Sequence, residues 1–185
     1  MKVSDIVTVA AQLINEEEIV DGLKDYPDAS DFARKKIELM VSLFNLVVTE
    51  LSASFIPMKK TQKFCSVERK AAFKDFDEKV LEILAVYGAS GEKINYELHP
   101  TELVVSEEEF TVLYSYIPAT YDISGVIGYA ETEVSAGVLA YGLAAEYLLT
   151  ERRFAEAVAW HARFEKAVKT LCAPKNVTAK NRAWR

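Results

Sequence analysis

The spacing of apolar residues changes twice along the chain, and this change limits the folds that the sequence can adopt. Up to about residue 60 apolar side chains recur at helical spacing, between about residues 61 and 118 they alternate as in strands, and from residue 119 the helical spacing returns. A β region enclosed by helices predicts the α+β class. We expect residues 1–60 and 119–172 to form an antiparallel helical bundle, residues 61–118 an inserted antiparallel β subdomain, and residues 173–185 an extended basic C-terminal arm.

The N-terminal region is predicted to form two helices. Ser4 can cap a first helix, which must have ended by Pro27. Asp28 or Ser30 can cap a second, long helix that ends before Pro57. Its broad apolar face is typical of a core helix. The residues predicted on this face are Phe32, Met40, Leu43, Phe44, Val47, Leu51 and Phe55.

The middle of the chain predicts strands. Residues 79–88 and 93–100 are separated by a Gly-containing turn, which is typical of a hairpin. Residues 108–118 supply another strand, in which Phe110, Val112, Tyr114 and Tyr116 share one face. Two interpretations of the preceding segment stay open: an edge strand over residues 62–67, or a helix over residues 66–80.

Two further helices are predicted at the C-terminal end. Residues 131–150 are rich in Ala and Gly, so this backbone can approach a neighbouring helix closely. Thr150 is the predicted start of a last helix that runs to residue 171, and two helices with so short a link form an antiparallel hairpin. The inward-facing candidates on the last helix are Phe154, Val158, His161, Phe164 and Val168.

The end of the chain differs in charge from the rest. The whole chain carries −6, whereas residues 173–185 carry four cations and no acid, which leaves −10 for residues 1–172. An acidic body argues against wrapping a nucleic-acid backbone, because that requires many Lys and Arg residues on one face. The tail also contains Trp184, and Trp and Arg often anchor interfaces. We therefore expect an acidic partner to order the tail.

The same sequence predicts a soluble protein that is neither exported nor associated with a membrane. No run of eighteen apolar residues occurs, and acidic residues surround the short N-terminal apolar stretch. Cys65 and Cys172 are far apart and lack a CxxC pattern, so neither a disulfide framework nor a zinc site is predicted. Both are expected to be buried, reduced thiols.

The sequence contains little that could perform catalysis. His99 lies in a Leu-His-Pro turn and His161 lies on the last predicted helix, with no Ser or Cys nucleophile motif near either. Neighbouring acids at residues 16–18 and 107–109 point in different directions, which favours solvated charge over a metal site. We expect no enzymatic activity, no cofactor and no metal. Core or interface packing, rather than a platform for bases or sugars, is predicted for Tyr87, Tyr96, Tyr114, Tyr116 and Tyr121.

The C-terminal third of the chain carries a family resemblance. VLAYGLAAEYLLTERRFAEAVAWHARFEKAVKTL, followed by a basic tail that ends in Trp-Arg, resembles the head-to-tail adaptor (connector) group of neck proteins in tailed bacteriophages. The segments VLEILAVYGASGEKINYELHPTELVV and VLYSYIP are similar to the β region inserted in such proteins. The resemblance implies a structural virion protein of the neck, assembled in the host cytoplasm. It also implies a homo-oligomeric ring, commonly of twelve copies, that docks beneath the portal protein and carries the next neck or tail protein.

The resemblance further implies a role for the basic tail and for the acidic body. Lys175, Lys180, Arg182, Trp184 and Arg185 would form an arm that grips the portal. DNA would pass through the channel of the ring without sequence-specific binding, because negative walls repel phosphate.

Two other classes of protein stay open from the residues alone. One is a nucleic-acid-associated helical regulator, and the other is a small ligand-binding domain. The lack of a helix-turn-helix pattern with basic recognition residues counts against the first. The lack of a nucleophile, a metal set or a phosphate loop counts against the second.

Overall fold

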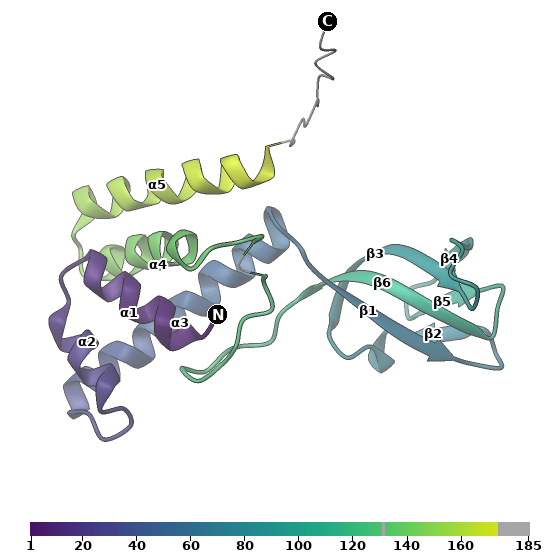
Figure 1. Ribbon diagram of the computed structural model, residues 1–185, viewed down its shortest axis with the longest axis horizontal. Coiled ribbons are helices and arrows are strands. Elements are labelled where there is room, and N and C mark those ends of the chain that lie inside the picture. Colours follow the sequence, from purple (N-terminus) through teal and green to yellow (C-terminus); the bar gives the residue numbers. More distant parts are fainter. Residues whose placement is uncertain (131, 174–185) are drawn as a thin grey trace, which may run out of the picture.

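The protein consists of a helical part and a β part that lie side by side, as seen in a computed structural model that describes residues 1–130 and 132–173 (Figure 1). The helical part contains α1 (Val3–Leu13), α2 (Glu17–Lys24), α3 (Asp31–Ser54), α4 (Ala136–Thr150) and α5 (Phe154–Cys172). The β part contains β1 (Met58–Cys65), β2 (Lys70–Ala72), β3 (Lys79–Gly88), β4 (Tyr96–Leu98), β5 (Glu102–Val105) and β6 (Glu109–Ile117). The α+β class predicted from the sequence is confirmed.

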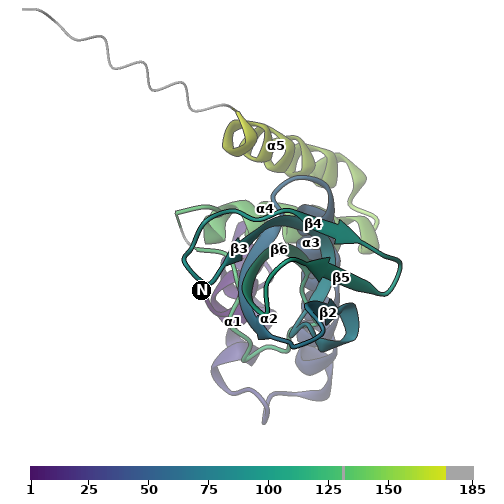
Figure 2. The same ribbon diagram turned by 90° about the vertical axis from the view of Figure 1, so that its right-hand side faces the viewer.

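The β part is built from two three-stranded antiparallel sheets with one apolar interior. Their strand orders are β1-β6-β3 and β2-β5-β4, and Figure 2 shows the strands curving around each other. Phe110, Val112 and Tyr114 of the central strand β6 are buried, as their alternation predicts. They pack with Leu103 of β5 and Val86 of β3, so both sheets contribute to the same core.

The structure decides between the two interpretations of the segment after α3. Residues 58–65 form a strand along the whole of β6, and residues 66–80 contain β2, a short 3₁₀ helix over Phe73–Asp75 and the start of β3, so the helical interpretation is wrong. The hairpin predicted for residues 79–100 is correct only near its turn. There the Ile94 amide donates to the Val86 carbonyl at 2.9 Å, after which β3 and β4 enter different sheets.

Helix α4 lies at the centre of the helical part. It contacts α1, α3 and α5, and nine of its 15 residues are buried. At Gly142 a Cβ would lie 2.8 Å from Val47 of α3 and 3.1 Å from Phe164 of α5. Glycine therefore allows both neighbouring helices to approach α4 closely, as the Ala and Gly content of this segment predicts.

Helix α3 is the longest element, with 24 residues. Ser30 caps it as predicted, because the Ser30 hydroxyl accepts from the Ala33 amide at 3.2 Å. By length and composition alone α3 could cross a membrane, as core helices of soluble proteins also could. Here Met40, Phe44 and Leu51 bury much of its apolar surface in the core of the helical part.

Two predicted helix starts are wrong for physical reasons. Ser4 lies inside α1, whose first amides donate to the carbonyls of Gly125 and Ile123 rather than to a capping side chain. Thr150 is the last residue of α4, where its hydroxyl donates to the Tyr147 carbonyl at 2.7 Å. The α4–α5 turn that follows places Arg152 in the left-handed region, with φ at 60°.

The segment that returns from β6 to α4 is fastened to the helical part at several places. The N-terminal residues bridge to it between Lys2 and Val126. In addition, the Asn45 amide group of α3 donates to the Tyr121 carbonyl at 2.9 Å and accepts from the Tyr121 amide at 2.7 Å. A single side chain therefore binds both backbone polar groups of one residue in this return segment.

We expect Asn45→Ala to lower the free energy of unfolding by about 1–2 kcal/mol. The change removes both bonds to Tyr121 and leaves the partner groups partly buried without them. Chemical denaturation of the two proteins measures the difference. Asn45→Asp is a second variant, which keeps the acceptor for the Tyr121 amide but turns a carboxylate oxygen toward the Tyr121 and Val41 carbonyls, so it should also lose stability at neutral pH. Equal stability of Asn45→Ala and the unaltered protein would contradict the role given to this side chain.

Candidate protein-interaction surface

The five tail residues predicted to contact a partner lie outside the described residues. These are Lys175, Lys180, Arg182, Trp184 and Arg185. Their predicted role is therefore neither supported nor opposed by the structure. The rest of the surface carries other candidate interaction sites. They consist of side chains that were not predicted to be exposed.

Several apolar side chains predicted to face inward are exposed instead. Helix α5 packs on α4 through a narrow stripe that includes Ala157, Phe164 and Val168, and only the last two of these were predicted. Phe154 and Val158 fall outside this stripe and are exposed, as is His161. Phe32 and Phe55, predicted on the inner face of α3, are exposed as well. Fewer apolar residues of α3 and α5 are buried than the helical spacing of apolar residues predicts.

The exposed apolar residues of α3 form one stripe. Phe32, Leu39 and Leu46 follow each other at seven-residue intervals, which keeps them on the same side of an α-helix. Glu50 lies on this side too, and it lines a pocket together with His161 and other residues of α5. At its Glu50 end the stripe therefore adjoins the side of α5 that carries exposed apolar residues.

We call this combined surface the apolar α3–α5 face. It consists of Phe32, Leu39, Leu46, Phe55, Phe154 and Val158, which are between 36% and 68% exposed. Six large side chains at about half exposure present on the order of 500 Å² of apolar surface. A standard protein interface buries about 800 Å² on each partner, of which a little more than half is apolar. The exposed apolar area of the two helices together is thus comparable with the apolar part of such an interface.

The opposite side of α5 borders a groove that we call the α4–α5 groove. Val138, Tyr141, Arg163, Lys166, Ala167, Thr170 and Leu171 line this groove, whose volume is about 510 Å³. Beside it Trp160 stacks on Tyr141 with ring centroids 5.6 Å apart, and the Arg163 guanidinium lies 4.5 Å from the centre of the Trp160 ring. An apolar floor with two cations at its rim suits a partner surface that is apolar and carries acids.

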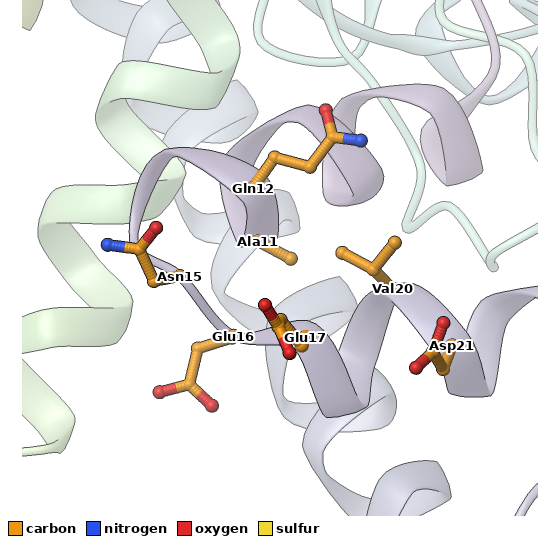
Figure 3. Close-up of a pocket in the computed structure, with 7 residues that line it drawn as sticks. All are labelled: Ala11, Gln12, Asn15, Glu16, Glu17, Val20 and Asp21. Atoms are coloured by element: carbon orange, nitrogen blue, oxygen red, sulfur yellow. The ribbon is translucent and has the colours of Figure 1, made fainter.

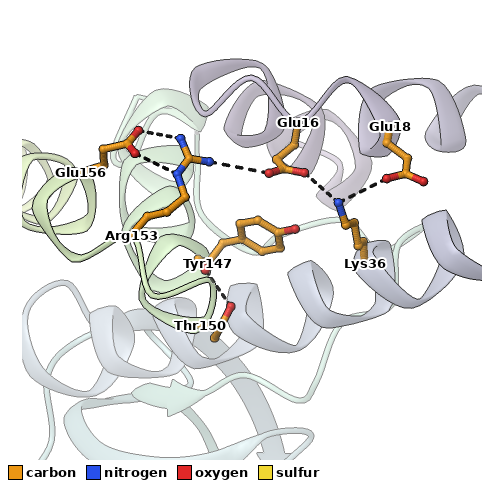
Figure 4. Close-up of polar contacts among 7 residues, drawn as sticks. All are labelled: Glu16, Glu18, Lys36, Tyr147, Thr150, Arg153 and Glu156. Atoms are coloured by element: carbon orange, nitrogen blue, oxygen red, sulfur yellow. Dashed lines mark hydrogen bonds and ion pairs between the residues drawn. The ribbon is translucent and has the colours of Figure 1, made fainter.

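A charged network joins three elements of the helical part (Figure 4). Lys36 of α3 contacts Glu16 at 3.0 Å and Glu18 at 3.3 Å, and Glu16 also lies 3.7 Å from Arg153 in the α4–α5 turn. Burial lowers the pKa of Lys36, but its hydrogen bonds to Glu16 and Glu18 outweigh this effect and raise it overall. The residues of this network are therefore charged, and their ion pairs connect α2 and the α4–α5 turn to α3.

Tyr147 of α4 lies beneath this network and is fully buried. Within the described part of the chain its hydroxyl has no hydrogen-bond partner. Burial, together with the negative charge of Glu16, raises the pKa of Tyr147 to about 12. An uncharged phenol in a closed, tightly packed position is a cost to stability rather than a feature of a reactive site.

A polar pocket of about 390 Å³ lies between the end of α1 and the start of α2 (Figure 3). Ala11, Gln12, Asn15, Glu16, Glu17, Val20 and Asp21 line it. Among residues 1–130 and 132–173 no group of three or more His, Cys, Asp or Glu side chains could hold a metal ion. Because Glu16 already pairs with Lys36 and Arg153, this pocket is best explained as a charged surface between two helices.

The histidines and cysteines lie apart from one another. His161 is 3.5 Å from Glu165 on the exposed side of α5, and His99 is 3.9 Å from Glu97. Cys65 and Cys172 are both free and exposed, so the prediction of buried thiols is wrong. Each sits at the end of its element, where the chain leaves the sheet or the helix and packing is incomplete.

No protein-family model matches the chain, and no curated protein matches it either.

The sequence could have indicated one part of the apolar α3–α5 face. The seven-residue spacing of Phe32, Leu39 and Leu46 is visible in the sequence, since a second apolar stripe on a helix that already has one is a sign of contacts on two sides. Nothing comparable distinguishes Phe154 or Val158 from the buried residues of α5. Their exposure depends on how far the neighbouring helices extend around α5.

Proposed function

We propose that this protein is a structural, non-enzymatic head-to-tail adaptor of a tailed bacteriophage. In this role copies of the chain form a ring beneath the portal protein and join the DNA-filled capsid to the next neck or tail protein. The helical part serves as an antiparallel bundle that lines the ring, and residues 173–185 serve as the extended arm that grips the portal.

The observation that carries this proposal is the apolar α3–α5 face. Exposed apolar residues of α3 and α5 flank the pocket that Glu50 and His161 line, and an exposed apolar area of this kind favours an interaction surface. The resemblance of the last two helices and the basic tail to adaptor proteins gives the kind of interaction. Because the face and the α4–α5 groove lie on opposite sides of α5, the bundle suits a protein with a neighbour on each side.

Electron microscopy of the protein mixed with a portal ring tests the proposal. We expect a second ring docked on the portal with the full-length chain, and none with a chain that ends at Cys172. The shortened chain retains all of α5, so its circular dichroism spectrum and melting temperature should match those of the full-length chain. Failure of the full-length chain to bind any portal ring tested would reject the adaptor function.

Two measurements separate this proposal from the alternatives. DNA affinity that falls steeply with salt would favour a nucleic-acid-associated regulator. A saturable thermal shift with a small molecule would favour a ligand-binding domain, for which the groove between β3 and β4 is the place to look. We expect neither result from an adaptor.

A further inference from the structure

We infer that the apolar α3–α5 face of one copy of this chain packs into the α4–α5 groove of the next copy. The inference rests on the proposed function only in that both require copies to associate side by side. It goes further by assigning the two contact surfaces, which are different patches of the same chain. Such a contact is heterologous, and it leaves one face and one groove free at the two ends of an open assembly but none free in a closed ring.

The positions of the two surfaces fit this arrangement. His161 lines a pocket together with Glu50 of α3, and Phe154 and Val158 share its side of α5 by helical spacing. Trp160, Arg163 and Ala167 lie on the side that borders the groove. The two sets are separated by the stripe that packs on α4. Each copy therefore presents its two surfaces in different directions, and a contact between them can repeat from copy to copy.

The chemistry of the two surfaces is complementary. Within the described residues Glu50, at the edge of the apolar α3–α5 face, forms no ion pair. Arg163 and Lys166, at the rim of the groove, form none either within the same ranges. Apposition of the face and the groove brings an unused carboxylate toward unused cations and covers apolar surface on both sides. Apposition of two identical faces would instead leave the Arg163 and Lys166 cations of the groove unused.

Three double variants test the inference without a portal. The face variant carries Leu46→Glu and Val158→Glu, the groove variant Arg163→Glu and Lys166→Glu, and the control Val67→Glu and Leu98→Glu. All replaced side chains lie at the surface, and the control changes two exposed apolar residues of the β part. Melting temperatures of the variants should stay close to that of the unaltered protein. Sedimentation velocity at up to about 1 mM protein, which detects weak contacts, measures association.

We expect the unaltered protein and the control to associate, and the face and groove variants each to associate at least about tenfold more weakly. An equimolar mixture of the two defective variants should form a one-to-one dimer that grows no further, because one intact face meets one intact groove. An unaltered protein that stays monomeric, a face variant that associates normally, or a mixture that fails to form the dimer would overturn the inference. A groove variant with unaltered association would show that two identical faces meet.

The outcomes distinguish this inference from the adaptor function. Head-to-tail association without portal docking would leave the contact standing and reject the adaptor. Portal docking by variants whose association is unchanged would retain the adaptor and reject the contact.

Discussion

Replacing Gly142 with leucine is expected to lower the free energy of unfolding by about 3 kcal/mol. Even a Cβ at this position would lie 2.8 Å from a methyl carbon of Val47 and 3.1 Å from the ring of Phe164, and leucine adds three more carbons. Because Val47 is buried and β-branched, it cannot turn away without moving α3. The better helix propensity of leucine offsets only about 1 kcal/mol of this cost. Urea denaturation of both proteins measures the difference.

Gly137 supplies the matched control for this prediction. It lies in the first turn of α4, and a Cβ there would have only the Ser135 hydroxyl nearby, at 3.8 Å. Gly137→Ala should leave stability unchanged or raise it by less than about 1 kcal/mol. If Gly142→Leu proved as stable as Gly137→Ala, the conclusion that α3 and α5 leave no space for a side chain at Gly142 would be rejected.

Replacing Tyr147 with phenylalanine is expected to raise the free energy of unfolding by about 1–2 kcal/mol at neutral pH. The tyrosine hydroxyl is buried without a hydrogen-bond partner among the described residues, so folding removes it from water without compensation. Phenylalanine keeps the ring and its packing. Thermal or chemical denaturation measures the gain.

The effect of this replacement should grow with alkaline pH. An unfolded tyrosine loses its proton near pH 10, whereas burial raises the pKa of Tyr147 to about 12 in the folded protein. The stability that depends on the protonated phenol is therefore complete below pH 10 and is lost as the pH rises toward 12. For Tyr147 alone this loss amounts to about 3 kcal/mol. The phenylalanine variant should not show it.

Tyr129→Phe is expected to change the free energy of unfolding in the opposite direction. The Tyr129 hydroxyl is also in the interior, but it donates to the Ile56 carbonyl at 2.6 Å. Tyr129→Phe removes that bond and should cost about 1 kcal/mol at neutral pH. A loss of stability in both variants would mean that the Tyr147 hydroxyl has a favourable partner after all.

Periodicity was sufficient to predict the order of elements, because it depends only on neighbouring residues. The alternation of Phe110, Val112 and Tyr114 predicts β6, and the apolar spacing of α3 together with Ser30 predicts the start of the longest helix. The pairing of strands into two sheets did not follow, since β3 and β4 share a turn but end in different sheets. Contacts between distant segments decided that.

The candidate surface could not be predicted for a similar reason. Exposure of Phe154 and Val158 depends on how much of α5 is covered by α4 and α3, and their residue types are the same as those of core positions. The helix start at Val3 likewise depends on carbonyls more than a hundred residues away in the chain, at Ile123 and Gly125. Local patterns carry no information about partners of this kind.

The chain enters and leaves the β part at neighbouring points, since Met58 at the start of β1 pairs with Tyr116 near the end of β6. Each part also has its own apolar core, with Tyr116 touching both. A short turn between these two points would therefore close the helical part without the intervening residues. At the level of the gene, we expect the segment for residues 59–115 to behave as a cassette that can be lengthened, exchanged or deleted while the helices, Met58 and Tyr116 are retained.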